Sequence, residues 1–314
     1  MTSVVPVSCV ISSFNKKEHV LANLRALAEQ RARPAEVIVV DNASSDGTEA
    51  AVRAEFPDVK LIVMPHSRFG ACETFNLGFK AATQEFVAIL DDDVVLPPDW
   101  LERLLARFSR EPSTTALITT LVIEPDMPDA YLARADVREE RYLCTFRGCG
   151  SLARRAALEQ AGFYDERLFI YGNERDLATR LLDLGWRVLL HPDVVTFHAT
   201  PFGLKAGKRS LYYHVRNFWI YAFKHCAWSD VVKVAWKLAS KALFGGAAKQ
   251  STDRDAGAAA AEATGTIGLN ESLKQTPGGR WIAVKATLNA LLNLPYCLAR
   301  RRVCRAPDFR LPVH

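Results

Sequence analysis

A five-residue apolar run at positions 86–90 ends abruptly in three consecutive carboxylates, Asp91, Asp92 and Asp93. Such an uninterrupted run is typical of a strand buried on both faces. Adjacent carboxylates repel one another, so a folded chain places them at the end of a buried strand when a cation or a set of donors meets them there. Ligands of open parallel sheets bind just beyond the carboxyl ends of the strands. The pattern therefore predicts a divalent-cation site, with an acidic turn before a helix at Trp100 as the alternative.

Apolar runs and helical periodicity alternate along the first part of the chain. The strand patterns cover residues 7–12, 36–41, 59–64 and 86–90. The helix patterns cover residues 18–30, 49–56, 73–82 and 100–108. Strand–helix units in this succession predict an α/β fold with a doubly wound, mostly parallel sheet.

Asp41 ends the second strand pattern, where an acid can hydrogen-bond a ribose or the edge of a base. No Gly-x-Gly-x-x-Gly pattern follows the first strand, because residues 12–17 (SSFNKK) occupy that loop. This disfavours a dinucleotide site and a Walker-type phosphate loop. A helix-capping turn is the alternative role for Asp41 and Asn42.

Composition limits the class of protein. With 314 residues, 49% of them hydrophobic, the chain can bury the core of one large domain or two ordinary ones. Its seven cysteines are scattered and include no Cys-x-x-Cys pair, so they suggest neither a disulfide framework nor a zinc site, and they fit a reducing compartment. The N-terminus has no charged region of the kind that begins a signal peptide.

The net charge of +5 is unevenly distributed. Residues 1–199 contain 22 Lys and Arg against 29 Asp and Glu, a net of −7, whereas residues 200–314 contain 18 against 6, a net of +12. A basic segment can meet nucleic acid or an anionic membrane. The interleaved aromatic and aliphatic residues favour the membrane and argue against nucleic acid; a solvated basic face without a partner is the alternative.

Six segments resemble the motifs of the family 2 glycosyltransferases. They are VSCVISSFN (7–15), VVDNASSDGT (39–48), LDDD (90–93), GCGSLARR (148–155), GFYDERLF (162–169) and ERDL (174–177). The resemblance covers roughly the first two hundred residues. It implies a GT-A fold with a helical C-terminal extension, inverting transfer from a nucleoside-diphosphate sugar, and a Mg²⁺ or Mn²⁺ ion.

The resemblance also implies a role for particular residues. Those expected to bind the nucleotide sugar are Ser13, Asn15, Asp41, Asn42, Asp91 and Asp92. Those expected to bind the metal are Asp91, Asp93 and His198, the last of which ends an apolar run and is otherwise an ordinary histidine. The expected catalytic residues are Glu174 and Asp176. The chain departs from the family pattern at Phe14, where Tyr is usual, and at Asn173-Glu174, where Glu-Asp is usual.

Carboxylates suit this chemistry independently of the resemblance. A nucleoside diphosphate leaves readily only when its developing charge is neutralised, and oxygen ligands favour Mg²⁺ or Mn²⁺ over zinc. Inversion needs one general base, and Glu174 is preferred to Asp176 for that role. The alternative is that Asn173 caps a helix, with Asp176 completing a near capping box and Glu174 only complementing the helix dipole.

We expect the catalytic domain to cover residues 1–200, with a nucleotide-sugar half at about 1–110 and an acceptor half at about 111–200. A basic aromatic helical segment (201–246), a flexible linker (247–279) and an amphipathic C-terminal helix with a basic tail (280–314) follow. The apolar stretch near Trp281 is interrupted by Lys285 and Pro295, so it suits the membrane interface better than a span. Packing on the catalytic domain is the alternative.

The predicted function is metal-dependent transfer of a hexose or deoxyhexose to a glycan or lipid-linked acceptor in cell-envelope polysaccharide synthesis. The expected location is the cytoplasm, at the inner face of the plasma membrane. A sugar-nucleotide pyrophosphorylase and a non-catalytic scaffold of a glycan-assembly complex are the alternatives. Residues 12–17 lack the Gly-rich basic loop of the former, and the retained acids argue against the latter. The sequence selects no particular sugar, acceptor or oligomeric state.

Overall fold

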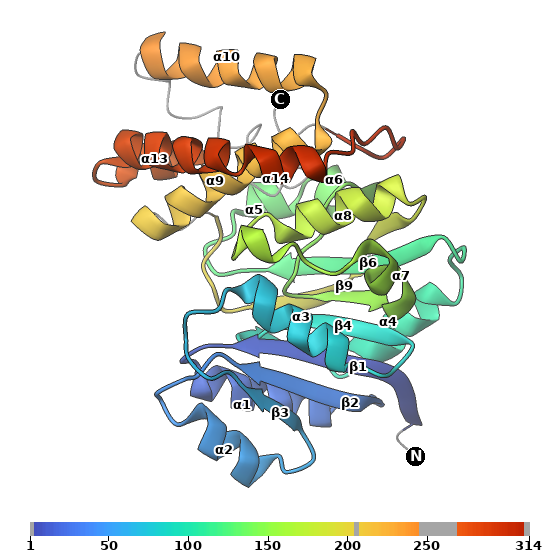
Figure 1. Ribbon diagram of the computed structural model, residues 1–314. Coiled ribbons are helices and arrows are strands. Elements are labelled where there is room, and N and C mark those ends of the chain that lie inside the picture. Colours follow the sequence, from blue (N-terminus) through green and yellow to red (C-terminus); the bar gives the residue numbers. More distant parts are fainter. Residues whose placement is uncertain (1–2, 204–206, 245–268, 311–314) are drawn as a thin grey trace.

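The computed structural model describes residues 3–203, 207–244 and 269–310. A nine-stranded sheet runs through the molecule in the order β3-β2-β1-β4-β8-β6-β9-β5, with β7 paired to β9 (Figure 1). It consists of a parallel N-terminal half and a mixed C-terminal half. The fold class predicted from the sequence is confirmed.

The N-terminal half alternates strands and helices. Its parallel strands are β1 (Ser3–Ser13), β2 (Ala32–Asp41), β3 (Lys60–Val63) and β4 (Phe86–Asp91). The helices are α1 (Lys17–Ala28), α2 (Thr48–Glu55), α3 (Ala71–Ala81) and α4 (Trp100–Phe108). All eight lie where periodicity predicted them, because each apolar run or stripe is long enough to identify its element.

The C-terminal half departs from a purely parallel sheet. Its strands are β5 (Val94–Val95), β6 (Thr115–Ile123), β7 (Arg141–Leu143), β8 (Ser151–Arg154) and β9 (Arg187–His198). The helices between them are α5 (Asp129–Leu132), α6 (Ala135–Arg138), α7 (Arg155–Ala161), the 3-10 turn η1 (Glu166–Leu168) and α8 (Asn173–Asp183). Strand β8 pairs antiparallel with both β4 and β6, whereas β6 and β9 are parallel. This arrangement brings the loop before β8 to the carboxyl end of β4.

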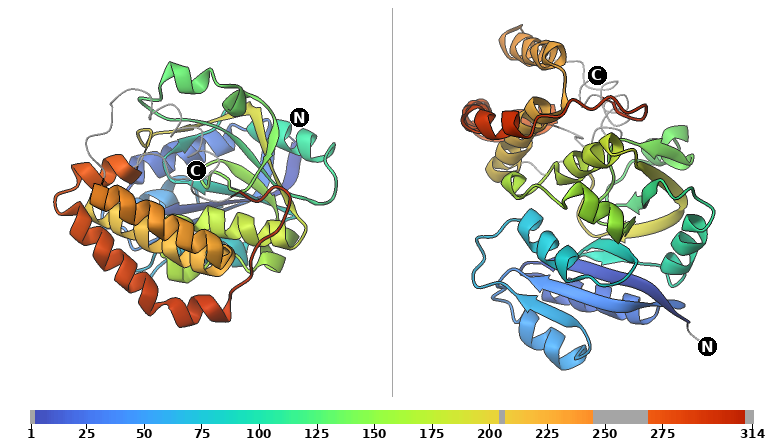
Figure 2. Two further views of the ribbon diagram at one scale, coloured as in Figure 1. Left: turned by 90° about the horizontal axis from the view of Figure 1, so that it is seen from above. Right: turned by 45° about the vertical axis from the view of Figure 1, so that its right-hand side comes forward.

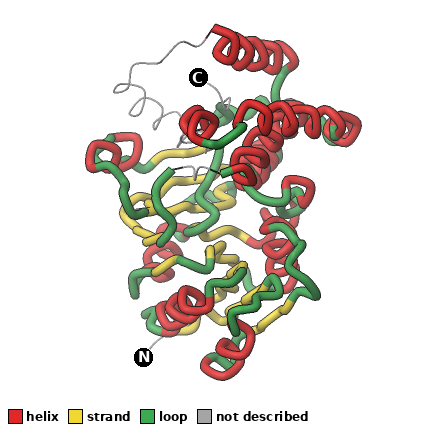
Figure 3. Tube along the Cα trace, turned by 90° about the vertical axis from the view of Figure 1, so that its left-hand side faces the viewer, coloured by secondary structure: helices red, strands yellow, loops and turns green. Residues whose placement is uncertain are grey.

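Helices cover both faces of the sheet, as the tube in Figure 3 shows. On one face, Phe75 and Phe79 of α3 and Leu177 of α8 pack with Val10 of β1. On the other face, α1, α2 and α4 contribute a second core. Its helical members include Val20, Leu21, Leu24, Val52, Trp100, Leu101 and Leu104. The sheet is therefore buried on both sides, which explains the uninterrupted apolar composition of β4.

The C-terminal helices gather at the end of the molecule away from α2 (Figures 1 and 2). They are α9 (Lys208–His225), α10 (Trp228–Phe244), α12 (Leu269–Gln275), α13 (Gly279–Leu292) and α14 (Leu294–Ala299). Trp219 of α9 donates its indole N–H to Thr287 of α13 at 3.1 Å, and Ile220 lies in the core beside Leu177. Helix α9 therefore packs as part of the main core.

Two boundaries differ from those expected. Helix α12 lies within the stretch expected to be a linker, of which residues 247–268 lie outside the described residues. Pro295 falls in the first turn of α14 and divides the C-terminal apolar stretch into two short helices. No helix in the described ranges combines the length and hydropathy needed to cross a bilayer.

A buried ionic network joins α9 to α8. The Lys224 ammonium is 2.7 Å from Asp165 and also contacts Asp176, and the side chains of Lys224 and Asp176 are 2% and 0% exposed. His225 Nε2 lies 2.9 Å from Asp176 Oδ1, and Arg180 Nε lies 2.9 Å from Asp176 Oδ2. Burial alone would raise the pKa of Asp176, but these cations hold it well below the usual range.

We predict that Lys224→Met lowers the free energy of unfolding by about 3–5 kcal/mol, because it leaves two carboxylates without their buried cation. Lys233→Met is the control. The Lys233 side chain is 77% exposed, and its ion pair with Asp230 is long, at 3.4 Å. The free energy of unfolding should therefore change by no more than about 0.5 kcal/mol. Urea unfolding followed by circular dichroism measures both. Equal, small losses would contradict the assignment of the network as a structural link.

Candidate active site

The three carboxylates lie in the turn between β4 and β5. Asp91 ends β4 opposite Ser12 of β1, and β5 returns antiparallel to the end of β9, so that Val94 pairs with His198. Asp92 and Asp93 are buried, whereas 40% of the Asp91 side chain is exposed. The sheet therefore brings His198, more than a hundred residues away in sequence, to the carboxylates.

Cations already compensate the buried carboxylates. Lys16 Nζ lies 2.6 Å from Asp93 Oδ2 and 3.4 Å from Asp92 Oδ1. His198 Nε2 lies 3.1 Å from Asp93 Oδ1 and 3.7 Å from Asp91 Oδ2. Although burial opposes ionisation, hydrogen bonds from His198 and Lys16 hold the pKa of Asp93 well below its usual range. Burial raises the pKa of Asp91 to about 6; the His198 charge opposes this rise, and the charges of Asp92 and Asp93 add to it.

Glu124 holds the opposite side of the His198 ring. Its Oε1 lies 2.9 Å from His198 Nδ1, and it also pairs with Arg147. Burial lowers the pKa of His198, but hydrogen bonds to Asp93 and Glu124 outweigh burial and raise it to about 9. These contacts therefore favour the protonated, positively charged form of His198 beside the acidic turn.

The loops expected to bind the nucleotide lie at the same edge. Ser13 of β1 pairs with Asp41 of β2, and Asn15 Oδ1 accepts the Ser45 N–H at 2.8 Å. The Asp41 carboxylate accepts both the N–H and the hydroxyl of Ser44, which makes it a turn residue as well. Burial raises the pKa of Asp41, and the bonds from Ser44 oppose that rise.

Two buried atoms at this edge, Ser13 Oγ and Asn42 Oδ1, have no hydrogen-bond partner among the described residues. Buried polar atoms of this kind are normally satisfied by water or by a ligand. They support the expectation that a polar ligand binds between β1 and β2.

Glu174 and Asp176 share the first turn of α8 but lie in different surroundings. Glu174 Oε1 lies 2.7 Å from the position of a Cβ on Gly148, so this carboxylate packs against the loop that continues to Cys149. Burial raises the pKa of Glu174 to about 7. Asp176 instead belongs to the Lys224 network. The structure therefore brings Glu174, and not Asp176, to the loop that borders Asp91.

The predicted helix cap at Asn173 is wrong. Gly172, with φ of 75°, precedes the helix, and Asn173 is its first residue. Glycine adopts this left-handed backbone at little cost. The amide nitrogen of Asn217 on α9 lies 2.8 Å from the carbonyl oxygens of Leu168, Ile170 and Tyr171. Helix α9 thus fixes the loop that leads into Glu174.

A divalent cation suits this site. The carboxylates of Asp91 and Asp93 both lie close to His198 Nε2, and His198 and Lys16 provide the positive charge beside them. An entering ion can displace the proton of His198 and the ammonium of Lys16, because both occupy positions that are favourable for positive charge.

Sequence comparison identifies the family. Residues 8–162 match the family model described as Glycosyl transferase family 2. The chain is 26% identical over 279 residues to the N-acetylglucosaminyl-diphospho-decaprenol L-rhamnosyltransferase of Mycobacterium tuberculosis, covering 73% of this chain and 87% of the relative. It is 28% identical over 213 residues to a pre-mycofactocin glycosyltransferase of that species, covering 63% of this chain and 42% of the relative. The chain belongs to glycosyl transferase family 2 and is a glycosyltransferase.

Solved structures agree on the fold. The mannosyltransferase PcManGT of Pyrobaculum calidifontis, in complex with GDP-Man and Mn²⁺, matches 94% of this chain and 83% of its own, with a TM-score of 0.54 and 20% identity. The TarS 1–349 structure from S. aureus in complex with UDP-GlcNAc matches 93% and 92%, with a TM-score of 0.55 and 13% identity. The expected GT-A fold is confirmed.

The sequence analysis missed the residues that support the site. Lys16, Glu124 and Thr200 contact the predicted residues, the last donating to Asp93 at 2.9 Å, and Arg147 pairs with Glu124. Lys16 could have been considered from the sequence, because it directly follows Asn15 in a loop that was already expected to bind the nucleotide sugar. Glu124 follows β6 without any motif, so only strand pairing reveals its neighbour.

We predict that His198 titrates near pH 9 in the metal-free protein, because three carboxylates stabilise its cationic form. Glu124→Gln should lower this pKa, since it removes one negative charge and its hydrogen-bonded acceptor. Histidine ring resonances followed by NMR across the pH range measure both values. A wild-type midpoint near the ordinary value of about 6.5 would contradict the described pairing.

Proposed function

We propose that this protein is a metal-dependent, inverting glycosyltransferase that moves a sugar from a nucleoside-diphosphate donor to a hydroxyl of a glycan or a lipid-linked acceptor in cell-envelope polysaccharide synthesis. One observation carries the proposal. Gly148 and Cys149 are consecutive, and the first touches Glu174 while the second lies beside Asp91 and His198. A candidate base and a candidate metal site therefore border the same loop.

The donor would lie across the carboxyl ends of β1, β2 and β4. In this proposal Asp41 and Asn15 hold the base and ribose, and Ser13 and Asn42 supply further polar contacts. Asp91, Asp93 and His198 hold Mg²⁺ or Mn²⁺, with Asp92 beside them. When bound, the ion neutralises the charge that develops on the leaving diphosphate. Lys16 is placed to supply a second positive charge at the same edge.

Glu174 acts as the general base in this proposal. Its pKa of about 7 suits removal of a proton from a hydroxyl near neutral pH. The Asn217 contacts and the Lys224 network hold the first turn of α8, which orients the carboxylate. Asp176 is proposed as a structural residue.

The acceptor class and membrane contact rest on two further observations. The rhamnosyltransferase relative is named for a diphospho-decaprenol acceptor. In this chain, α10, α13 and α14 present apolar side chains to solvent. They are Trp228, Val232, Trp236, Trp281, Val284, Leu288, Leu291, Leu292 and Leu298, each at least 46% exposed. Lys233, Arg280 and Lys285 lie among them and are also exposed. We propose that these three helices bind an anionic membrane surface.

A panel of nucleotide sugars incubated with Mn²⁺ tests the proposed function. Release of a nucleoside diphosphate supports the transferase, whereas release of pyrophosphate indicates a pyrophosphorylase. No reaction with any donor and ion indicates a scaffold. Asp93→Asn should abolish metal-dependent donor hydrolysis, and Asp58→Asn, which alters an exposed acid after α2, should not. Retained activity in folded Asp93→Asn would contradict the metal assignment.

Replacing the proposed base separates it from its neighbour. Glu174→Gln should leave donor binding nearly unchanged and slow transfer by about 10²- to 10⁴-fold. Asp176→Asn should chiefly lower stability. In the wild type, kcat/KM should rise as the pH increases through about 7, because Glu174 is active only when unprotonated. A similar pH profile in Glu174→Gln would contradict this role.

Membrane binding is predicted for vesicles that contain anionic lipid. Each Lys or Arg near such a surface contributes about 1 kcal/mol, screened by salt, and buried tryptophans add apolar contact. Wild-type protein should sediment with these vesicles at low salt and be partly released at high salt. Trp236→Ser combined with Trp281→Ser should weaken binding. Val4→Ser is the matched control, because Val4 is 70% exposed on β1, near the opposite end (Figure 1). Equal binding by both variants would contradict the assignment.

A further inference from the structure

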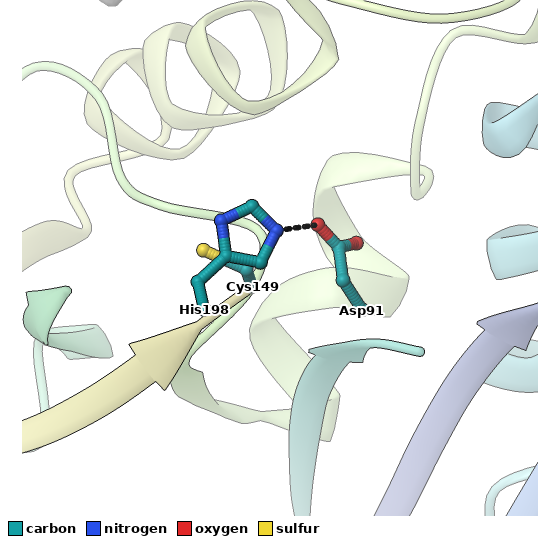
Figure 4. Close-up of side chains that lie close together, drawn as sticks. All are labelled: Asp91, Cys149 and His198. Carbon is teal, nitrogen blue, oxygen red and sulfur yellow. Dashed lines mark ion pairs between the residues drawn. The ribbon is translucent and has the colours of Figure 1, made fainter. Parts of the chain in front are cut away.

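A sulfur ligand that the sequence analysis did not associate with the site lies beside Asp91 and His198. Asp91 at the end of β4, Cys149 in the loop before β8 and His198 at the end of β9 each offer one ligand atom, and these atoms lie within 4.8 Å of one another. Figure 4 shows a ring nitrogen of His198 directed at the Asp91 carboxylate, with the Cys149 side chain close to the ring. Among the described residues, this is the one such group of three His, Cys, Asp or Glu side chains.

The separations suit a small tetrahedral ion. Zinc binds sulfur at about 2.3 Å and nitrogen or oxygen at about 2.0–2.2 Å, so neighbouring ligand atoms around it lie roughly 3.3–3.7 Å apart. His198 Nε2 and Asp91 Oδ2 are 3.7 Å apart. The Cys149 sulfur lies within 4.8 Å of the other two ligand atoms, so it has to move toward them by about 1 Å to reach these separations.

The surroundings orient the His198 ring for metal binding. Glu124 engages Nδ1 at 2.9 Å, which leaves Nε2 directed toward Asp91 and Asp93. A carboxylate on the outer nitrogen is the usual support of a metal-binding histidine, because it fixes the tautomer and the ring orientation. Burial raises the pKa of the Cys149 thiol, and nearby Arg147 opposes that rise. Without a metal ion the thiol is neutral, which argues against a role as a nucleophile.

The donor set differs from one built for Mg²⁺ or Mn²⁺ alone. Those ions prefer oxygen ligands, whereas thiolate with imidazole selects zinc, which also stands higher in the Irving–Williams order. We propose that Asp91, Cys149 and His198 bind Zn²⁺ more tightly than Mg²⁺ or Mn²⁺, and that bound Zn²⁺ excludes the activating ion and inhibits transfer. The proposed inhibition of transfer rests on the proposed function, whereas the proposed zinc binding does not. Three protein ligands leave the fourth zinc position open.

The spacing of the three ligands along the sequence explains why this site could not be predicted from it. Zinc motifs are recognised when two ligands are close in sequence, and here the three ligands come from separate strands and loops. The antiparallel insertion of β8 between β4 and β6 places Cys149 beside Asp91.

Cobalt binding tests the site without any activity measurement. Co²⁺ added to metal-free wild-type protein should give a thiolate-to-cobalt charge-transfer band in the near ultraviolet. Cys149→Ser and Cys149→Ala should lose this band. Cys144→Ser is the matched control, because Cys144 is also buried but packs with Leu182 and Cys304. Absence of the band from the wild type, or its persistence in both folded Cys149 variants, would overturn the proposal.

Zinc affinity, measured by competition with a chromophoric chelator, gives the second readout. Cys149→Ser should bind Zn²⁺ at least about 10-fold more weakly than wild type. Loss of a residue that only hydrogen-bonds a metal ligand already lowers metal affinity by about 10-fold. Equal affinities would overturn the site. In donor hydrolysis with Mn²⁺, added Zn²⁺ should inhibit wild type and Cys144→Ser, and inhibit Cys149→Ser less, relative to each protein without zinc.

The two proposals fail in different ways. Zinc binding without turnover of any donor refutes the proposed function and leaves the metal site standing, while its inhibitory role falls. Turnover of a donor without tight zinc binding refutes the zinc site only. Tight zinc binding that leaves Mn²⁺-dependent turnover unchanged refutes the inhibition.

Discussion

Electrostatic compensation of the buried acidic turn after β4 is the constraint on which the site depends. Asp92 and Asp93 are buried beside Asp91, and isolated charges in such surroundings would be strongly unfavourable. Lys16 from the loop after β1 and His198 from the end of β9 supply the missing charge. Because these cations come from both halves of the sheet, the acidic turn connects the two halves. The same charge balance makes the turn a suitable place for a divalent ion.

A second compensation places the proposed base. Asp176 is buried in α8 and paired with Lys224 of α9, while Asn217 of the same helix binds the loop before α8. Helix α9 therefore orients the first turn of α8, in which Glu174 lies. In the basic C-terminal region, α9 packs on α8 and α13, whereas α10 and α13 carry exposed apolar side chains. Packing against the rest of the protein and the proposed membrane contact can therefore both hold for the C-terminal region.

The sequence was sufficient for elements with strong local patterns. The apolar run before Asp91 identified β4, and the apolar run before Asp41 identified the end of β2. Features set by tertiary pairing were not predictable in this way. Cys149 reaches the site because β8 inserts antiparallel, and Glu124 because β6 pairs with β9. The incorrect cap at Asn173 has a local cause, since Gly172 adopts a left-handed backbone that the capping pattern did not consider.

The central claim is that the acidic turn binds a divalent ion together with the donor diphosphate. Crystals grown with Mn²⁺ and a nucleoside diphosphate would test it through anomalous scattering at the manganese edge. The account predicts one strong anomalous peak within bonding distance of Asp93 and of a phosphate oxygen, with the base near Asp41. A peak elsewhere, or a diphosphate bound at this edge with no metal beside Asp93, would contradict it.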